Sequence, residues 1–474
     1  MKIPLDVVLS KIAAKVTPTQ HERDLMNHLS IKLQDAVGGI LRQAGFNAEV
    51  SVQGSVARDT WLHNEGDLDI FASFPDNIDR GEWKGSVLPP LRKGLSRYHV
   101  LERYAEHPFL ELEVDGVKVN IVPCYQVEQG KWKSATDRTP FHTAYMRQRL
   151  TDQLRLEIRI LKKFMKGVGV YGAEIRIGGF SGMLVETLTL KYGSFQETLS
   201  HSSDWRNRTV IEIEESGRGE RELSQKFDSP LIVVDPIDPN RNLAAAVRTE
   251  RLWEFVEIAR QFQDHPGISY FYPRKPRQKT SQQLSNRLKK RECDFVVALF
   301  PHSQVILDIL WGQLYSLEKS LVTLFERHQF RTLRSTVWGD ADRASGILIA
   351  VETARLPPSQ IHLGPPVEKR KESTSFLNKH VQSGDTISGP WIQGDRWMVE
   401  KRRQFPNISK LIVASARNRQ LGLSVPAQLE DGFRKRVKVL LNEQALSICQ
   451  LSGFAETFWK FMDGKPAWLG TPQT

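Results

Sequence analysis

The sequence predicts a multidomain α+β protein, because helical and strand-forming segments alternate along a chain too long for one domain. The chain has 474 residues, and at roughly 150 residues per domain this length corresponds to about three domains. Residues 18–45 carry apolar side chains at helical spacing, whereas residues 108–114 and 117–122 alternate between apolar and polar side chains. Between these alternating runs, Asp115 and Gly116 form the dipeptide typical of a tight hairpin turn. The N-terminal part is therefore expected to be built on a small mixed sheet.

Two further strands are expected between the first helix and the hairpin. Side chains alternate over residues 48–53, and a second run, over residues 67–74, continues from two aspartates into apolar residues. Gly54 and Ser55 lie after the first of these strands and lead into a short helical turn.

The chain after residue 150 divides into a helical region and two mixed regions. The helical region spans residues 152–195, and one face carries Leu154, Ile158, Leu161 and Met165. A loop is expected to contain residues 235–242, Asp-Pro-Ile-Asp-Pro-Asn-Arg-Asn. Later elements are helices over 252–262 and 306–330 and strands over 295–300 and 346–351. Gly364-Pro365-Pro366 marks a boundary, beyond which short strands and basic helix are expected.

Charge and composition narrow the class of protein. The 66 Lys and Arg residues exceed the 55 Asp and Glu residues, giving a net charge of +11. This surplus suits nucleic acid or an anionic membrane surface, or reflects only an alkaline proteome. An apolar content of 40% excludes a disordered or fibrous chain. The distant Cys124, Cys293 and Cys449 exclude a disulfide framework and a CxxC metal site, so a reducing, cytoplasmic location is expected.

The sequence contains no signal of membrane insertion. No run of 18 or more apolar residues occurs, and the N-terminus lacks the apolar core of a signal peptide. No interaction with a membrane is therefore expected, and the basic surplus is assigned to other partners.

The most specific chemical feature is the Gly54-Ser55 turn followed by Asp67 and Asp69. Backbone N–H groups and a hydroxyl at a strand-to-helix turn can bind a phosphate. Two residues apart on a strand, the aspartates point to the same face. Such a pair can hold divalent ions for in-line nucleotidyl displacement, and Mg²⁺ suits a sparse set of oxygen ligands. An isolated Asp-x-Asp more often lies in a solvated turn, but this pair enters an apolar strand.

These motifs together resemble the nucleotidyltransferase superfamily that is similar to DNA polymerase β. Further segments resemble one branch of it, the archaeal (class I) CCA-adding tRNA nucleotidyltransferases. The resemblance is dense over residues 50–250 and thin afterwards. The segments that carry it are residues 104–108, 119–125, 134–142, 161–162, 171–174, 179–182 and 235–245.

The resemblance implies an architecture and an activity. It implies a palm-like catalytic head over residues 1–150, a helical neck over 151–265, a small α+β body over 266–362 and a mixed α/β tail over 363–474. Members of the family add C, C and A to the 3′ end of tRNA from CTP and ATP, with Mg²⁺ and without a nucleic-acid template. The expected partners are therefore the acceptor stem and TΨC arm of tRNA, and a homodimer is consistent with the family.

The resemblance also implies a nucleotide pocket. It assigns nucleotide binding to Gly54, Ser55, Arg58, His142, Lys162, Tyr171 and Arg241. The Gly-Ser turn and Arg58 would hold the triphosphate, and His142, Lys162 and Tyr171 would complete that pocket from the head and the neck. Arg241 would read the Watson–Crick edge of the base. The alternatives are a helix cap for His142, a solvated helix charge for Lys162, and a rigid turn around Arg241.

One expected metal ligand departs from the family pattern. A third aspartate is replaced here by Asn120, which keeps a carbonyl oxygen but loses the negative charge, so catalytic competence is in question rather than the fold. A two-residue turn at 115–116 would pair Glu111 with Asn120 on one face. Glu111 is then a candidate for the missing carboxylate. The alternative is that Glu111 and Glu113 face solvent beside Lys118.

Two rival functions follow from these motifs. Asn120 motivates a tRNA-binding homologue that has lost or reduced turnover, although the intact acidic pair and the set of predicted nucleotide-binding residues argue against it. The other rival is a related poly(A) polymerase or oligoadenylate synthetase. The length of the product made on tRNA distinguishes all three.

Overall fold

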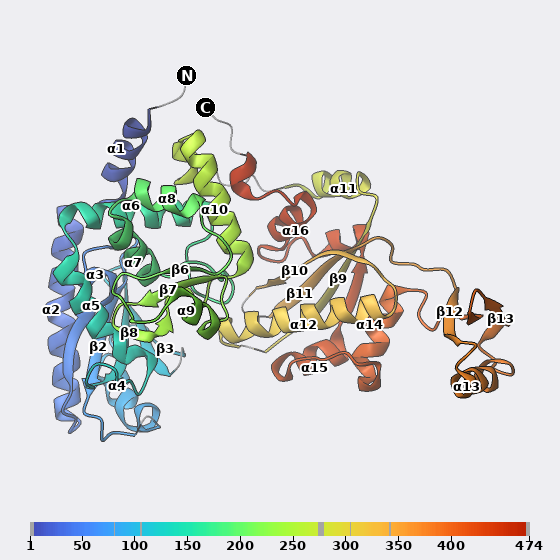
Figure 1. The fold of residues 1–474 in the computed structure, drawn as a ribbon. Helices are drawn as coiled ribbons and strands as arrows, with labels where there is room; N and C mark the ends of the chain where they lie inside the picture. The colour runs from blue at the N-terminus through green and yellow to red at the C-terminus, as the bar shows by residue number, and fades with distance from the viewer. Residues whose placement is uncertain are drawn as a thin grey trace. The chain divides into compact units, whose positions relative to one another are not determined.

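The computed structural model describes residues 4–79, 81–104, 107–273, 279–303, 305–340 and 343–470 (Figure 1). The chain divides into two compact units, one formed by residues 1–275 with 466–474 and the other by residues 276–465. The sequence Pro-Arg-Lys-Pro-Arg-Gln-Lys at residues 273–279 is a basic segment, and most of it lies outside the described residues. None of the helices in the described ranges combines the length and apolar character needed to cross a membrane.

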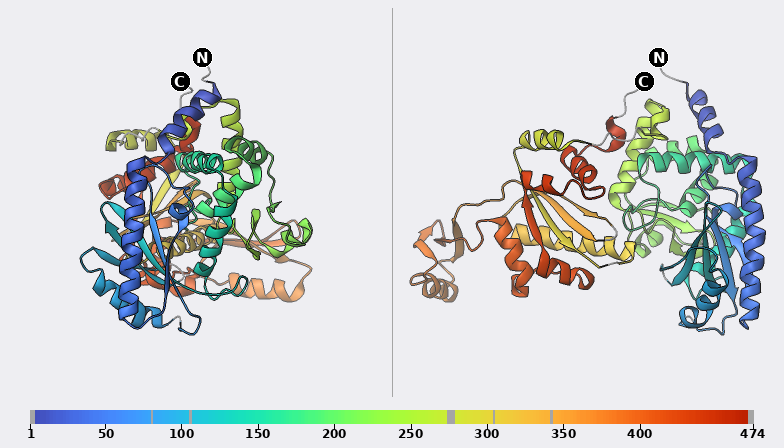
Figure 2. Two further views of the ribbon diagram at one scale, coloured as in Figure 1. Left: turned by 90° about the vertical axis from the view of Figure 1, so that its left-hand side faces the viewer. Right: turned by 180° about the vertical axis from the view of Figure 1, so that it is seen from behind.

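The first unit begins with a five-stranded sheet of order β1-β2-β5-β4-β3. The strands are β1 (Glu49–Gln53), β2 (Leu68–Phe74), β3 (Val100–Tyr104), β4 (Pro108–Val114) and β5 (Val117–Tyr125). β2 and β5 run parallel, and the other neighbours are antiparallel. Helices α2 (Gln20–Gln43) and α4 (Leu88–Gly94) pack on this sheet (Figure 2), and Leu33 of α2 and Ile70 and Ile121 of the sheet share one fully buried core.

The hairpin between β4 and β5 confirms the predicted register. Asp115 and Gly116 both have positive φ, 51° and 76°, as a two-residue turn of this kind requires. Counting outward from this turn, Glu111 pairs with Asn120, and across the parallel neighbour Asn120 pairs with Asp69. Because alternate residues point to opposite faces, these three side chains form a row on the face away from the core.

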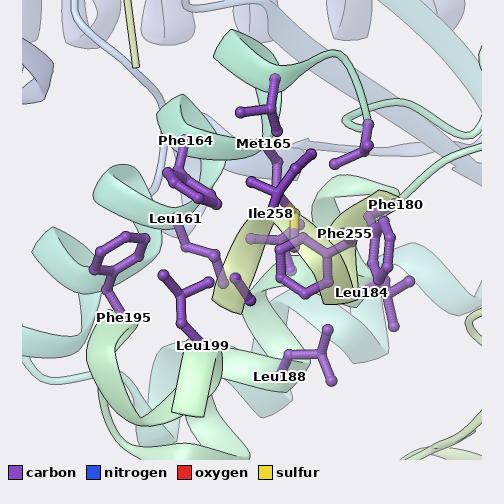
Figure 3. Close-up of a cluster of buried hydrophobic side chains, with 14 of the residues drawn as sticks. Leu161, Phe164, Met165, Phe180, Leu184, Leu188, Phe195, Leu199, Phe255 and Ile258 are labelled. Carbon is purple, nitrogen blue, oxygen red and sulfur yellow. The ribbon is translucent and has the colours of Figure 1, made fainter. Parts of the chain in front are cut away.

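The remainder of the first unit is a helical layer with a small three-stranded sheet. Its helices are α1 (Leu5–Val16), α3 (Gly54–Ala57), α5 (Arg138–Arg149), α6 (Asp152–Val168), α7 (Gly182–Tyr192), α8 (Phe195–Ser203), α9 (Glu220–Lys226) and α10 (Thr249–Asp264). α6 buries the predicted apolar face, and Figure 3 shows Leu161 and Met165 packed with Phe180, Leu184 and Phe255. This core fixes α6 and α7 against each other.

The prediction of a loop over residues 235–242 is wrong, because this segment contains strands. β6 (Thr209–Ile211), β7 (Leu231–Asp235) and β8 (Asp238–Asn242) form a sheet of order β6-β7-β8, so the segment is a tight hairpin. The side chain of Asn242 secures it, because its Oδ1 accepts from Val233 N and its Nδ2 donates to the Leu231 carbonyl. Side-chain bonding to the neighbouring strand thus compensates for a proline-rich sequence.

The second unit is built on a four-stranded antiparallel sheet of order β10-β11-β9-β15. The strands are β9 (Asp294–Pro301), β10 (Thr332–Gly339), β11 (Ala344–Val351) and β15 (Lys438–Leu441). α12 (Leu307–Arg327), α14 (Ile408–Arg417) and α15 (Ala427–Arg436) cover one face, and α11 (Ser281–Lys289) and α16 (Phe454–Asp463) cover the other (Figure 1). The predicted helix over 306–330 and the predicted strands over 295–300 and 346–351 are confirmed.

A smaller sheet in this unit differs from the predicted division into body and tail. β12 (Ser359–Pro366), β14 (Arg396–Arg402) and β13 (Thr386–Gln393) lie in that order and carry α13 (Arg370–His380). The predicted boundary at residue 363 therefore falls inside a strand. Moreover β15, from the predicted tail, pairs with β9 of the predicted body.

Candidate active site

The predicted acidic pair lies against the predicted Gly-Ser turn. Asp69 belongs to β2, and Asp67 immediately precedes that strand. Gly54 begins α3 with a φ of 72°, and a Cβ at this position would come within 2.2 Å of Asp69 Oδ2. Both the left-handed backbone and the close approach therefore require glycine here. Ser55 follows in α3, so the turn lies directly beside the Asp69 carboxylate.

Asp69 is bound by a neutral side chain. Asn120 Nδ2 donates to Asp69 Oδ1 at 2.9 Å. Burial raises the pKa of Asp69, with Asn120 acting in the opposite direction, and desolvation also raises the pKa of Asp67. The other end of the Asn120 amide, Oδ1, is buried and has no hydrogen-bond partner among the described residues. Desolvated carboxylates beside an orphaned oxygen favour the arrival of a cation.

Glu111 lies on the same face but is engaged by two cations. Arg103 Nη2 lies 2.8 Å from Glu111 Oε1, and Lys118 Nζ lies 3.0 Å from Oε2. Although burial acts to raise the pKa of Glu111, these two partners lower it overall. The predicted pairing of Glu111 with Asn120 is confirmed, while Glu113 is exposed. Glu111 therefore adopts neither predicted state fully, because it is half-buried and bound to Lys118 and Arg103.

The donor set of this face fits a hard cation held by few protein ligands. Within the described residues, no group of three His, Cys, Asp or Glu side chains is arranged to hold a metal ion. Two carboxylates and one unpartnered amide oxygen are present instead. This set matches Mg²⁺, which keeps waters and substrate phosphates among its ligands.

A second polar cluster surrounds Glu186 of α7, a residue that the sequence analysis missed. Glu186 is fully buried, and its Oε2 accepts from Arg58 Nε at 2.6 Å. Its Oε1 accepts from Lys162 Nζ at 2.7 Å and from the Thr60 hydroxyl at 2.5 Å. Arg58 and Lys162, predicted from the sequence, are themselves 8% and 3% exposed. Lys162 is thus a buried, paired cation rather than a solvated helix charge.

The electrostatics of this cluster favour its charged form. Burial alone would raise the pKa of Glu186, but Arg58 and Lys162 outweigh that effect and hold it at about 2. Burial lowers the pKa of Lys162, and Glu186 opposes that shift. One signal in the sequence could have found Glu186, since it is a lone acid in a helix whose neighbours Leu184, Val185 and Leu188 are all apolar. A buried acid of this kind requires a partner.

A third polar cluster surrounds Asp235, at the end of β7. His142 Nε2 lies 2.9 Å from both Asp235 carboxylate oxygens, and Arg241 Nη1 lies 2.9 Å from Oδ2. Burial would raise the pKa of Asp235, but its bonds with His142 and Ile237 N and the charge of Arg241 lower it. His142 lies inside α5, so a helix-capping role is excluded. Asp235 is the first residue of the motif at residues 235–242, but the sequence alone does not indicate a role for its side chain.

The predicted residue Tyr171 lies beside the Glu186 cluster. Burial raises the pKa of Tyr171, and the nearby Glu186 and Glu174 raise it further. The Lys166 ammonium lies 5.1 Å from the centre of the Tyr171 ring. A Cβ on Gly182, the first residue of α7, would come within 3.0 Å of the Tyr171 hydroxyl. The phenol therefore approaches the same helix that carries Glu186.

The Glu186 cluster and the Asp235 cluster are linked through α5. Arg58 Nη1 donates to the Thr143 hydroxyl at 3.3 Å, and Thr143 follows His142 in the chain. The structure thus brings the predicted nucleotide-binding residues into two groups, one around Glu186 and one around Asp235. Arg58 also contributes to the field at Asp69, so the acidic pair belongs to the same region.

Similarity to known proteins covers most of the chain. Family models match at residues 36–142 (nucleotidyltransferase domain), 156–272 (tRNA nucleotidyltransferase, second domain) and 291–438 (CCA-adding enzyme, C-terminal domain). A structure of the RNA terminal uridylyl transferase Cid1 has a TM-score of 0.45 and 12% identity, covering 56% of this chain and 97% of that chain. The domain matches define this chain as a nucleotidyltransferase.

Similarity over nearly the whole chain then specifies the branch. The CCA-adding enzyme of Haloarcula marismortui is 32% identical over 98% of this chain and 100% of its own length. That of Pyrobaculum islandicum is 37% identical over 85% of this chain and 92% of its own length. The chain belongs to the family of CCA-adding enzymes.

Proposed function

We propose that this protein adds C, C and A to the 3′ end of tRNA from CTP and ATP, without a nucleic-acid template and with release of diphosphate. The observation that carries the proposal is the placement of Asp69 against the Gly54-Ser55 turn, with Asp67 just before the same strand and buried cations in the same region. Family membership supplies the acceptor and the order of nucleotides, and the site supplies the chemistry.

Asp67 and Asp69 are the proposed catalytic residues and the proposed Mg²⁺ ligands. Bound Mg²⁺ would neutralise the triphosphate and increase the acidity of the tRNA 3′ hydroxyl. Asn120 orients Asp69 through Nδ2, and its Oδ1 offers a neutral third oxygen. Glu111 could join only by leaving its bonds with Arg103 and Lys118, so we assign the third position to Asn120.

The nucleotide is proposed to lie between the polar cluster around Glu186 and the polar cluster around Asp235. Gly54, Ser55 and Arg58 would bind the triphosphate, because the turn offers backbone N–H groups and Arg58 offers a guanidinium. Lys162 and Tyr171 would complete this side of the pocket. The residues assigned to the opposite side are His142, which extends the phosphate contacts, and Arg241, which reads the base edge.

The proposed macromolecular partner is tRNA, bound through its acceptor stem and TΨC arm. A net charge of +11 favours a phosphate backbone. The basic run at 434–438 contributes less than its sequence suggests, because Arg434 is bonded to Glu430, and Lys435 and Arg436 are bonded to Asp431. The homodimer stays a prediction, which light scattering of the purified protein would test.

The function is tested with tRNA that ends at the discriminator base, incubated with CTP, ATP and Mg²⁺. Addition of three nucleotides, read as product length on a sequencing gel, is the expected result. No extension would favour a tRNA-binding homologue, for which Asn120 is the motivation. An unbounded adenosine tail would favour a poly(A) or oligoadenylate activity. Omitting ATP should give a product extended only by C residues, which checks the nucleotide order.

A further inference from the structure

Glu186 connects the two cations that are proposed to meet the triphosphate. It is fully buried in α7, while Arg58 follows α3 and Lys162 lies in α6. The three side chains therefore come from separate elements of the first unit. With two positive charges and one negative charge, the group carries a net charge of +1.

Arg58 contacts both carboxylate oxygens of Glu186, through Nε to Oε2 at 2.6 Å and through Nη2 to Oε1 at 3.5 Å, while the other partners of Glu186 contact Oε1 alone. Oε1 accepts from Lys162 and from Thr60, and Lys162 places its remaining contacts on the Thr60 hydroxyl and carbonyl, both at 3.0 Å. Oε2 accepts the short bond from Arg58 Nε. A guanidinium that is hydrogen-bonded at Nε has a fixed plane, and this fixes the directions of its terminal N–H donors. The orientation of Arg58 therefore depends on both oxygens of Glu186, and its shorter bond is to Oε2, the oxygen that Lys162 does not contact.

We propose that Glu186 is a positioning residue of the nucleotide pocket: it holds the Arg58 guanidinium ready for the triphosphate and compensates one of the two buried cations. The proposal rests on the assignment of Arg58 to the triphosphate made under the proposed function. Fixed donors bind a polyanion with less reorganisation than mobile ones. A buried counterion also avoids two uncompensated cations side by side, which would be costly in a desolvated site.

The substitution Glu186→Gln separates these effects. Glutamine keeps the size and retains one oxygen for Lys162 and Thr60, but its NH₂ group would face the Arg58 Nε–H donor. The affinity of the protein for CTP, measured by calorimetry without tRNA, is expected to fall by about tenfold. In Arg58→Ala the affinity falls as well, and the double variant Arg58→Ala/Glu186→Gln is expected to be no weaker than Arg58→Ala alone.

A matched control lies on the same helix as Lys162. Arg159 of α6 is 3% exposed, and its Nη2 lies 2.6 Å from Asp59 Oδ1 and bonds also to the Asp59 carbonyl. Arg159→Met removes a buried cation from its ion pair with the partly exposed Asp59, and Arg159 has no bond to Glu186. The variant is expected to lower the melting temperature while leaving the CTP affinity of the folded protein unchanged. Combined with Arg58→Ala, it should leave the CTP affinity at the value of Arg58→Ala alone.

The outcomes are separable. Wild-type CTP affinity in folded Glu186→Gln, or losses that add fully in the double variant, would overturn the positioning role. If Glu186→Gln does not fold, Glu186→Asp decides, since it keeps the charge but withdraws the carboxylate from Arg58, and an unchanged CTP affinity would again overturn the role. If Arg58→Ala itself binds CTP normally, the proposed contact of Arg58 with the triphosphate fails instead.

Discussion

The Glu186 and Asp235 clusters both compensate a buried carboxylate with basic side chains, but they differ in how far those side chains are exposed. Each places a buried carboxylate between two basic side chains. Around Glu186 both cations are buried, whereas in the Asp235 cluster His142 is buried and the side chain of Arg241 is 41% exposed. The first cluster is closed on both sides, and the second leaves one arm open to solvent.

This difference matches what each cluster is proposed to bind. The triphosphate is common to CTP and ATP, so a rigid group around Glu186 suits it. The base changes from cytosine to adenine, so an exposed arginine held at one end suits that side. The carboxylate of Asp69 is a third case, because it is bound by the neutral amide of Asn120. Asp69 has no bonded cation among the described residues, unlike Glu186 and Asp235, and this is why the metal ion is proposed to bind there.

The largest effect is expected at this third carboxylate, and it sets the scale for the other two. Asp69→Asn should lower the rate of nucleotide addition by roughly a thousandfold, because a metal-ligating charge is lost. Affinity for tRNA, measured by filter binding, should stay within about twofold, since the sheet is retained. Asp67→Asn should behave alike.

The control for that variant is Glu113→Gln, which removes an exposed acid from β4 of the same sheet. Addition rates near those of the wild type are expected for it. If Asp69→Asn were as active as Glu113→Gln, the catalytic role would have to be assigned to residues outside β2.

The closed cluster should reveal itself in the pH dependence of stability. Glu186 has a pKa near 2 in the folded protein against an ordinary value of 4.5. Because the folded pKa is lower, this group contributes stability above pH 4.5 that is lost as the pH falls toward 2. The contribution amounts to about 3 kcal/mol. Urea unfolding of the wild type should therefore weaken between pH 4.5 and 3 more steeply than that of Glu186→Gln.

Parallel slopes in the two proteins would contradict the depressed pKa of Glu186. Glu22, whose pKa is also held at about 2, is present in both proteins and cancels from the comparison.

The local parts of this site could be predicted from the sequence. The two-residue turn at Asp115-Gly116 fixes a register, and this register places Glu111 opposite Asn120 as expected. The acidic pair and the Gly-Ser turn are likewise close in the chain. Short-range geometry of this kind leaves few alternatives.

The long-range parts could not be predicted. Glu186 meets Arg58 across 128 positions of the chain, and β15 joins β9 with Lys438 opposite Leu299. No local pattern encodes such pairings, because they depend on how separate helices and strands pack. The hairpin at residues 235–242 was missed for a different reason, since side-chain bonds of Asn242 support a strand that its prolines disfavour.

Arg58 and Arg241 should differ in how their loss affects the KM values for the two nucleotides. Arg58→Ala is expected to raise KM for CTP and for ATP by the same factor, about tenfold or more, because the triphosphate is common to both. Arg241→Ala should change the ratio of the two KM values, because the base edges present different donors and acceptors. Steady-state rates with each nucleotide, on tRNA ending before C and on tRNA ending in CC, give both ratios. A change of ratio in Arg58→Ala would remove the distinction between the closed and open clusters.

The smallest effect is expected at Asn120. Asn120→Asp replaces the amide that donates to Asp69 by a second carboxylate, and two adjacent negative charges repel each other. Without metal, the melting temperature should fall by a few degrees. Added Mg²⁺ should raise it more than in the wild type, and addition at limiting Mg²⁺ should quicken a fewfold.

Glu111→Gln distinguishes the two sources of a third ligand. Glu111 is held by Arg103 and Lys118, so its loss should leave both Mn²⁺ affinity and the addition rate unchanged. Reduced Mn²⁺ affinity in Glu111→Gln, together with no gain in Asn120→Asp, would instead assign the third ligand to Glu111. In that case binding of the ion would have to pull Glu111 from its two partners. The acidic face would then resemble the Glu186 cluster in having a carboxylate with two bonded cations, but it would exchange them for a metal ion, whereas the Glu186 cluster stays closed.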